Sequence, residues 1–152
     1  MGETKIVIFS VGPESYGLPI ESVERIMNEV PVTRIPRTPA MLRGVFDLRG
    51  TTLPVLDLRL RFDMESTKDE KTFVIVQSGE LRVALVVDSV QGIEAIESSE
   101  IEPAPEGWAL KDDPFLSGIA KTNHGLVALL DSNFVVPKAI RDRTKKLDKS
   151  AA

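Results

Sequence analysis

The feature of this 152-residue chain that most restricts its fold is an internal repeat. A shift of 67 residues overlays an early block of the sequence on a later one, and a shift of 74 residues overlays a second block in the same order. The matched segments are Val7-Ile8 with Val74-Ile75, Gly12 with Gly79, Leu18 with Leu85, Ser22-Val23 with Ser89-Val90, Ile26 with Ile93, Gly44-Val45 with Gly118-Ile119, and Val55-Leu56-Asp57 with Leu129-Leu130-Asp131. Two matching blocks in one order indicate a duplicated structural unit.

Each copy of the repeat reads as a series of short β-strands, because β-branched and aliphatic runs are bounded by Gly, Pro or charged residues. The expected strands are Ile6–Phe9, Tyr16–Ile20, Thr52–Leu56, Thr72–Val76, Val83–Val87, and a hairpin of Ile119-Ala120 and Leu126–Leu130 that turns at Asn123-His124-Gly125. Short helices are expected at Glu21–Met27 and at Ser132–Arg143, and Asp131 or Ser132 caps the second.

Five short antiparallel strands suit a small SH3-like barrel, because closing a sheet hides its edges. One barrel of about 65 residues has little core of its own, so two barrels are expected to pack together and share one. We therefore predict a mainly β protein with two five-stranded SH3-like β-barrel subdomains, a groove between them, and a few short helices. The barrels are placed at about residues 5–66 and 70–137 of a single domain, 1–137, with the polar linker Asp63–Lys71 between them.

Charge is distributed unevenly along the chain. Residues 1–137 hold 13 Lys and Arg against 21 Asp and Glu, whereas the segment 138–152, expected to be a basic helix or tail, holds six against two. An acidic body argues against nucleic acid as a partner. Within it, Arg34–Arg61 is basic and Asp88–Asp113 is acidic, and the acidic Pro-containing stretch Glu97–Pro114 is expected to be a loop. These two segments suit head-to-tail protein contacts, or they are solvated faces.

The residues needed for catalysis are scarce. The chain has no Cys and a single His, His124, which lies in the expected hairpin turn without a second His or Cys to share a metal. No phosphate-binding glycine loop is present, so an enzyme on a β-barrel scaffold is the weaker alternative. The N-terminus, Met1–Lys5, leads into an apolar run too short for a signal peptide or a membrane span. A cytoplasmic protein without membrane insertion is expected.

What remains is a surface for protein contacts. Arg49 lies between Leu48 and Gly50, where a turn would present its planar guanidinium to a partner, or where it would bind carbonyls of its own loop. Val23 and Ile26 have helical i, i+3 spacing, so they form an apolar face or simply pack into the core.

Several segments in order, covering about residues 5–137, carry a family resemblance. The segments are Tyr16–Ile20, Val23–Ile26, Thr33–Pro39, Arg43–Arg59, Leu85–Val90 and Ile101–Pro105. Together they strongly resemble the CheW family of chemotaxis coupling proteins. The most specific part is Leu48-Arg49-Gly50 with its continuation Pro54-Val55-Leu56-Asp57.

This resemblance implies two SH3-like barrels, no catalysis, no metal and no cofactor. It implies an adaptor that binds methyl-accepting chemotaxis receptors and the regulatory domain of the histidine kinase CheA, joins other CheW-like domains in rings, and is recruited to membrane-associated receptor arrays. The receptor- and kinase-binding residues that it implies are Val23, Arg25, Ile26, Gly44, Leu48, Arg49 and Gly50. Two positions depart from the family pattern, because Asp47 replaces the usual Asn and Arg25 replaces a usual acidic residue.

The resemblance leaves a second interpretation open. A CheW-like docking module of a larger CheA- or CheV-type protein, or of a non-motility chemosensory system, would carry the same segments. The basic end of the chain, with its Ser150-Ala151-Ala152, resembles no linker into another domain and favours a separate adaptor.

Overall fold

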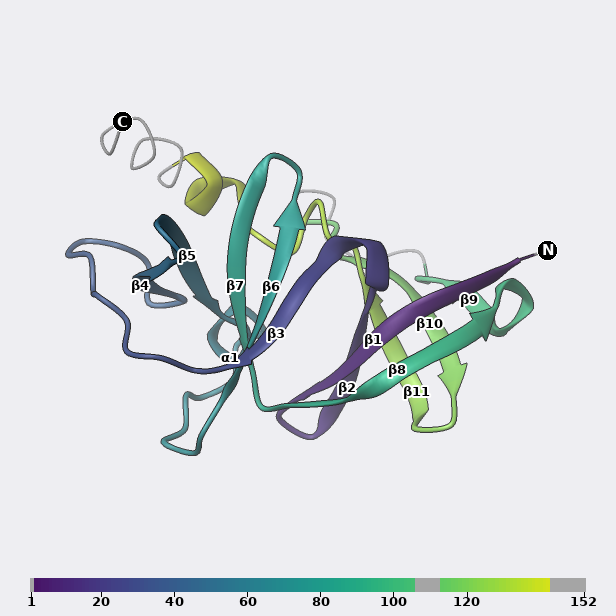
Figure 1. Ribbon diagram of the computed structural model, residues 1–152. Helices are drawn as coiled ribbons and strands as arrows, with labels where there is room; N and C mark the ends of the chain where they lie inside the picture. Colours follow the sequence, from purple (N-terminus) through teal and green to yellow (C-terminus); the bar gives the residue numbers. More distant parts are fainter. Residues whose placement is uncertain (1, 106–112, 143–152) are drawn as a thin grey trace.

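The computed structural model describes residues 2–105 and 113–142, and they form two β-sheets that lie against each other (Figure 1). The strands are β1 (Glu3–Val11), β2 (Glu14–Pro19), β3 (Val23–Asn28), β4 (Leu42–Leu48), β5 (Thr51–Asp57), β6 (Thr72–Ser78), β7 (Leu81–Val87), β8 (Ser89–Glu97), β9 (Ile101–Pro103), β10 (Leu116–Thr122) and β11 (Gly125–Leu130). The helical segments are η1 (Ile20–Ser22), α1 (Leu58–Arg61), η2 (Ser98–Glu100) and residues 138–142. The mainly β architecture with few short helices is as predicted.

The two sheets exchange strands between the two copies of the repeat. One has six strands in the order β8-β1-β2-β11-β10-β9, and the other has five in the order β3-β6-β7-β5-β4. The hairpin β1–β2 of the first copy therefore joins strands of the second copy, and the hairpin β6–β7 joins strands of the first. This arrangement differs from the contiguous barrels expected at 5–66 and 70–137, and the six-stranded sheet also gains β9.

The reason for the exchange is the shortness of two connections. Only the three residues of η1 separate β2 from β3, and only Asp88 separates β7 from β8. The single residue Asp88 cannot make an antiparallel return, which needs a turn of at least two residues between neighbouring strands. The three residues of η1 form a helical turn and not a hairpin loop, and they also carry the chain forward. The chain therefore runs on into the other sheet at both places.

The strand pairing repeats with the same shifts as the sequence. Val23 of β3 pairs with Val76 of β6, and their counterparts 67 residues away, Val90 of β8 and Phe9 of β1, also pair. The parallel pairs follow the same rule, because β5 pairs with β7 as β11 pairs with β2. Each copy thus supplies the same pairing to the other, which makes the two halves related by an approximate twofold axis.

Three apolar clusters fill the molecule. One cluster lies inside the five-stranded sheet and includes Phe46, Phe73 and Ile75, and another lies inside the six-stranded sheet and includes Ile6 and Ile8. The third lies between the sheets. Its members include Phe9, Leu18, Leu56, Val74, Leu85, Leu130 and Ile140. The shared core expected between two small barrels is therefore present, and it contains side chains from both copies.

The strands expected from the sequence are confirmed, and so is the tight turn of the β10–β11 hairpin, where Thr122 pairs with Gly125. The helix expected over Glu21–Met27 is wrong. Helical turn is confined to η1, because the residues that follow it form strand β3 and pair with β6. Tertiary pairing overrides the short helical spacing there.

Two expectations near the end of the chain also change. The helix expected over Ser132–Arg143 is a turn followed by helix at residues 138–142, which begins after Pro137, a residue that suits a first turn. Asp131 does accept a hydrogen bond from the amide of Asn133. The stretch Glu97–Pro114, expected to be a loop, contains η2 and β9, and its residues 106–112 and the tail 143–152 lie outside the described residues.

The strand exchange predicts that neither copy folds alone. A fragment of residues 1–66 lacks the β6–β7 hairpin of its sheet, and a fragment of residues 67–152 lacks β1–β2, so each should give a poorly dispersed amide NMR spectrum. Mixing the two fragments should restore native-like dispersion and a cooperative thermal transition. A cooperative transition in either fragment by itself would contradict this prediction.

Candidate functional site

A bulge in β3 determines which of its side chains share a face. The register of β3 against β6 shifts between Val23 and Arg25, so Glu24 is an extra residue without a partner in the ladder. Val23 lies opposite Val76 and Ile26 lies opposite Val74, and both partners belong to the core between the sheets. Val23 and Ile26 are therefore on one face despite their i, i+3 spacing, which in a regular strand would put them on opposite faces.

Val23 and Ile26 nevertheless have different environments. Val23 is half-buried and packs against the core between the sheets. Ile26 is 42% exposed and is one of four large apolar residues that are exposed in the described part of the chain, with Ile93, Leu126 and Phe134. Of the two alternatives that the sequence left open, core packing applies to Val23 and an exposed apolar contact point applies to Ile26.

The structure adds Ile93, which sequence reasoning did not place in the site. Ile93 is the counterpart of Ile26 in the second copy, lies on β8 opposite Val7, and is 58% exposed. Its neighbour Val90 packs against the shared core as Val23 does. The 67-residue shift matched Ile26 with Ile93, so the repeat itself was the signal that could have identified this second exposed isoleucine.

Arg25 lies on the other face of β3. It pairs with Ile75, whose side chain belongs to the core inside the five-stranded sheet, and it is half-buried. Its neighbour Glu24 is engaged by Arg82 of β7, with hydrogen bonds of 2.8 Å from Nε and 2.6 Å from Nη2. The hydrogen bond with Arg82 lowers the pKa of the Glu24 carboxyl, and Arg25 contributes a smaller electrostatic effect in the same direction.

The expected Leu-Arg-Gly block forms the tip of the β4–β5 hairpin. Leu48 pairs with Thr51, so Arg49 and Gly50 are a two-residue turn, and both have positive φ angles of 52° and 90°. Two positive φ angles in a two-residue loop match the twist of the flanking strands. Asp47 accepts a hydrogen bond from the Gly50 amide at 3.3 Å and closes the turn.

The Arg49 side chain is exposed at this tip, and among the residues that the structure describes it makes no hydrogen bond or ion pair. Arg49 therefore does not bind its own loop, which was one of the two roles open to it. Leu48, in contrast, is 9% exposed and packs inside the five-stranded sheet. The structure makes Leu48 an anchor for the turn and leaves Arg49 available to a partner.

Gly44 has a structural role that its sequence position did not reveal. Its φ is +142°, and an added Cβ would lie 2.0 Å from the carbonyl oxygen of Thr33. Thr33 and Val45 form a bridge with hydrogen bonds of 2.8 and 2.9 Å, so Gly44 allows the β3–β4 connection to lie directly on β4. Gly118 serves β9 in the same way, because its Cβ would lie 2.6 Å from the carbonyl oxygen of Glu102.

The expected site residues thus fall into two groups on opposite edges of one sheet. Val23, Arg25 and Ile26 lie on β3, and the others lie on β4 and its hairpin tip, with β6, β7 and β5 between them. The strand registers place the start of β3 and the tip of the β4–β5 hairpin toward the same end of this sheet. A partner binding at that end would meet both groups.

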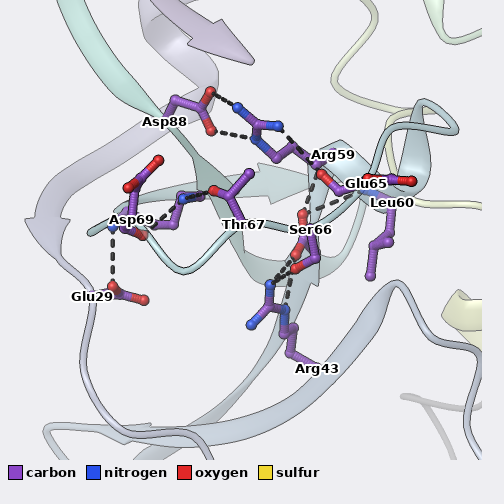
Figure 2. A network of polar contacts seen from close by, with 11 residues as sticks. Glu29, Arg43, Arg59, Leu60, Glu65, Ser66, Thr67, Asp69 and Asp88 are labelled. Atoms are coloured by element: carbon purple, nitrogen blue, oxygen red, sulfur yellow. Dashed lines mark hydrogen bonds and ion pairs between the residues drawn. The ribbon is translucent and has the colours of Figure 1, made fainter. Parts of the chain in front are cut away.

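The point where the chain passes from β7 to β8 is held by an ion pair. Arg59 of α1 binds both oxygens of Asp88 at 2.8 and 2.6 Å, and Asp88 also accepts from the Gly12 amide at 2.9 Å (Figure 2). Because Arg59 follows β5 and Gly12 lies in the β1–β2 turn, this contact joins the two sheets. Partial burial alone raises the pKa of the Asp88 carboxyl, but the hydrogen bonds from Arg59 and Gly12 outweigh it and lower the pKa below its usual 3.8.

The predicted linker Asp63–Lys71 is tied to the same network. Figure 2 shows Arg59 donating to the carbonyl of Glu65, at 3.2 Å, and Arg43 donating to the Ser66 hydroxyl at 2.5 Å. Arg43 also pairs with Asp57, which caps α1 by accepting from the Arg59 amide at 2.9 Å. The linker is therefore part of the joint between the sheets.

A cavity of about 630 Å³ lies beneath the connection between β3 and β4. Its lining comes from this connection, α1 and the linker, and it includes the basic side chains Arg34, Arg37 and Arg43 together with Pro and aliphatic residues. It belongs to the five-stranded sheet and its connections, and it is distinct from the groove that was expected between the two barrels. Of the predicted binding residues, none contributes to its lining.

The only His of the chain, His124, is in the β10–β11 turn, with its Nδ1 3.4 Å from a carboxylate oxygen of Glu94. Glu94 also accepts from the Asn123 amide at 3.0 Å, so it holds the turn against β8. Among the residues that the structure describes, no group of three or more His, Asp or Glu side chains is placed to hold a metal ion. Of the described helices, none has the length and apolar character to cross a bilayer.

The fold and site define a duplicated two-sheet scaffold with exposed apolar and basic contact points. The family model of the CheW-like domain matches residues 5–139. The chain is 36% identical to the chemotaxis protein CheW of Klebsiella aerogenes, covering 86% of this chain and 81% of that protein, and 31% identical to CheW of Bacillus subtilis, covering 88% and 87%. The crystal structure of the scaffolding protein TtCheW from Thermoanaerobacter tengcongensis superposes with a TM-score of 0.81 at 33% identity, covering 88% of this chain and 92% of that one.

The chain belongs to the CheW family. It is a chemotaxis scaffolding protein, and the family is one of non-catalytic adaptors, which agrees with the predicted family and with the prediction that the protein is not an enzyme.

The contact at Gly44 generates a stability prediction. The substitution Gly44→Ala should lower the free energy of unfolding by about 2–4 kcal/mol, because the methyl group meets a fixed backbone carbonyl. The matched control is Gly92→Ala, where φ is +150° but no atom lies within 4 Å of the added Cβ, and a loss of about 1 kcal/mol is expected from conformation alone. Chemical denaturation measures both, and equal losses would contradict the steric role.

The ion pair at Asp88 generates a pH prediction. Because folding lowers the pKa of Asp88, its charged form stabilises the protein above about pH 4, and this contribution is lost as the pH falls and the carboxylate is protonated. At pH 7, Asp88→Asn should cost about 1–3 kcal/mol in unfolding free energy, and the difference from wild type should shrink towards pH 3.

The control for this experiment is Glu24→Gln, which removes an ion pair exposed at the surface and should cost less than about 1 kcal/mol. Urea unfolding at pH 7, 5 and 3 measures all three proteins. A difference between wild type and Asp88→Asn that stays constant with pH would show that the charge of Asp88 does not stabilise the joint.

Proposed function

We propose that this protein couples methyl-accepting chemotaxis receptors to the histidine kinase CheA by protein contacts alone. The observation that carries this proposal is the exposure of Ile26 directly above the core between the sheets, with Arg49 free at the end of the same sheet. Exposed apolar side chains and Arg side chains are both typical of protein interfaces.

The receptor is proposed to bind along β3 and the β4–β5 tip through Val23, Arg25, Ile26, Arg49 and Gly50. A helical receptor tip would lay an apolar face against Ile26, which is a helix-in-groove mode of recognition. Leu48 and Gly44 support this surface from below, because Leu48 anchors the hairpin and Gly44 seats the β3–β4 connection. In this proposal five of the seven predicted residues contact the receptor, and Leu48 and Gly44 support them.

The kinase is proposed to bind head-to-tail, as would other CheW-like domains in a ring. The five-stranded sheet carries the cavity lined by Arg34, Arg37 and Arg43. The six-stranded sheet has an acidic counterpart, since Glu94, Glu97 and Glu100 line one concave surface. The basic surface on the five-stranded sheet of one molecule could then contact the acidic surface on the six-stranded sheet of a related domain. Such a contact is heterologous, and repeated contacts of this kind form rings or filaments. In this proposal the protein is cytoplasmic, and its contacts recruit it to membrane-associated receptor arrays.

The exposure of Arg49 generates the test of this function. The variant Arg49→Glu should weaken binding of a purified receptor signalling-tip fragment about tenfold or more, because a rim charge is reversed where the partner docks. Its thermal transition should stay within a few degrees of wild type, since among the described residues the side chain makes no hydrogen bond or ion pair that would be lost.

Lys121→Glu is a matched control, because Lys121 is exposed on the six-stranded sheet and makes only a 4.0 Å ion pair with Glu102. Pull-down with the receptor fragment and isothermal titration measure the binding of all three proteins. Wild-type affinity in a fully folded Arg49→Glu protein would remove Arg49 from the receptor-binding surface.

A further inference from the structure

Arg25 is a half-buried cation that acts electrostatically on the Glu24 carboxyl without forming an ion pair with it. Among the described residues, its guanidinium makes no hydrogen bond and no ion pair. The nearest carboxylate in sequence, Glu24, is already bound on both oxygens by Arg82. Of the other half-buried arginines, Arg59 pairs with Asp88 and Arg82 pairs with Glu24, whereas Arg141 donates to backbone carbonyls such as that of Ser78.

The position of Arg25 places this unpaired charge where a partner would lie. It follows the bulged residue Glu24 and precedes the exposed Ile26, on a strand at the edge of the five-stranded sheet. Side chains alternate across a strand, so a partner that packs along the edge of β3 reaches Ile26 from one face and Arg25 from the other. The apolar contact at Ile26 would also exclude water from the guanidinium and strengthen any charge pair there.

The second copy of the repeat shows that the fold does not need this charge. The counterpart of Arg25 on β8 is Gly92, with the same bulge and the same pairing to the neighbouring strand. An Arg can present a planar fork to a carboxylate and form two parallel hydrogen bonds, which a Lys cannot do. The bulge and the strand pairing at this position therefore do not depend on the charge of Arg25.

We infer that Arg25 selects the receptor partner by forming an ion pair with an Asp or Glu side chain of the receptor's helical tip, beside the apolar contact at Ile26. This inference rests on the proposed function, because it names the partner chemistry at the same surface. Arg25 thus determines specificity, and the apolar contact at Ile26 and the free charge of Arg49 supply the rest of the recognition.

The test uses the full chain and, as the probe, the purified signalling-tip fragment of a chemoreceptor from the same organism. Dissociation constants are measured by fluorescence anisotropy for wild type, Arg25→Gln and Arg25→Glu. The matched control is Lys5→Glu, an equal charge change at an exposed residue of β1 in the other sheet. Each variant is first checked by thermal denaturation, and Arg25→Gln keeps the length of the side chain should the Glu variant unfold.

The expected result is a loss of about tenfold or more for Arg25→Glu and a smaller loss for Arg25→Gln, with Lys5→Glu within about twofold of wild type. Replacing the acidic residues of the receptor tip by Lys, one at a time, should give one fragment that binds Arg25→Glu better than it binds wild type. Such a charge exchange identifies the carboxylate directly.

The outcomes separate this inference from the function on which it rests. Equal binding of wild type and Arg25→Glu, or a loss no larger than that of Lys5→Glu, would overturn the role of Arg25 and leave the coupling function standing. Loss of binding that no Lys replacement restores would overturn the ion pair. A wild-type protein that fails to bind the receptor fragment would overturn the coupling function and the inference together.

Discussion

The structure depends on one constraint, which is that the short connections at η1 and Asp88 carry the chain directly from one sheet into the other. Each β-hairpin is therefore paired with the later strands of the other copy, and the core between the sheets is filled from both. The joint that results is closed by Arg59, Asp88 and the Gly12 amide, so electrostatics and apolar packing hold the same boundary. The surfaces proposed for binding lie on strands whose positions this joint determines.

Much of the fold could be predicted, because the repeat is visible in the positions of small and aliphatic residues. The strand segments, the tight β10–β11 turn and the shared core follow from local pattern and from the limited core of a small barrel. The exchange of strands could not be predicted from those patterns, since they report which face of a strand is buried and not which strand lies beside it. Only the count of residues between Pro19 and Val23, or between Val87 and Ser89, hints at it.

The site was predictable to a different degree at each residue. Arg49 and Gly50 were identified correctly as a turn, because Gly and a polar neighbour tolerate positive φ. The face shared by Val23 and Ile26 was anticipated for an incorrect reason, since a bulge in a strand produces it and not a helical turn. The close approach of Thr33 to Gly44 and the capture of Glu24 by Arg82 depend on segments distant in sequence, which no local pattern reports.

The bulge in β3 has a consequence for how this surface can change over evolutionary time. A residue outside the hydrogen-bonded ladder can be replaced without altering the register of its strand. Selection for partner binding therefore restricts mutations beside it more strongly than selection for folding does. The two copies already illustrate such drift, with Glu24-Arg25 in one and Gln91-Gly92 in the other. Duplicated adaptors in a single cell could in this way diverge towards separate signalling circuits while their scaffolds stay interchangeable.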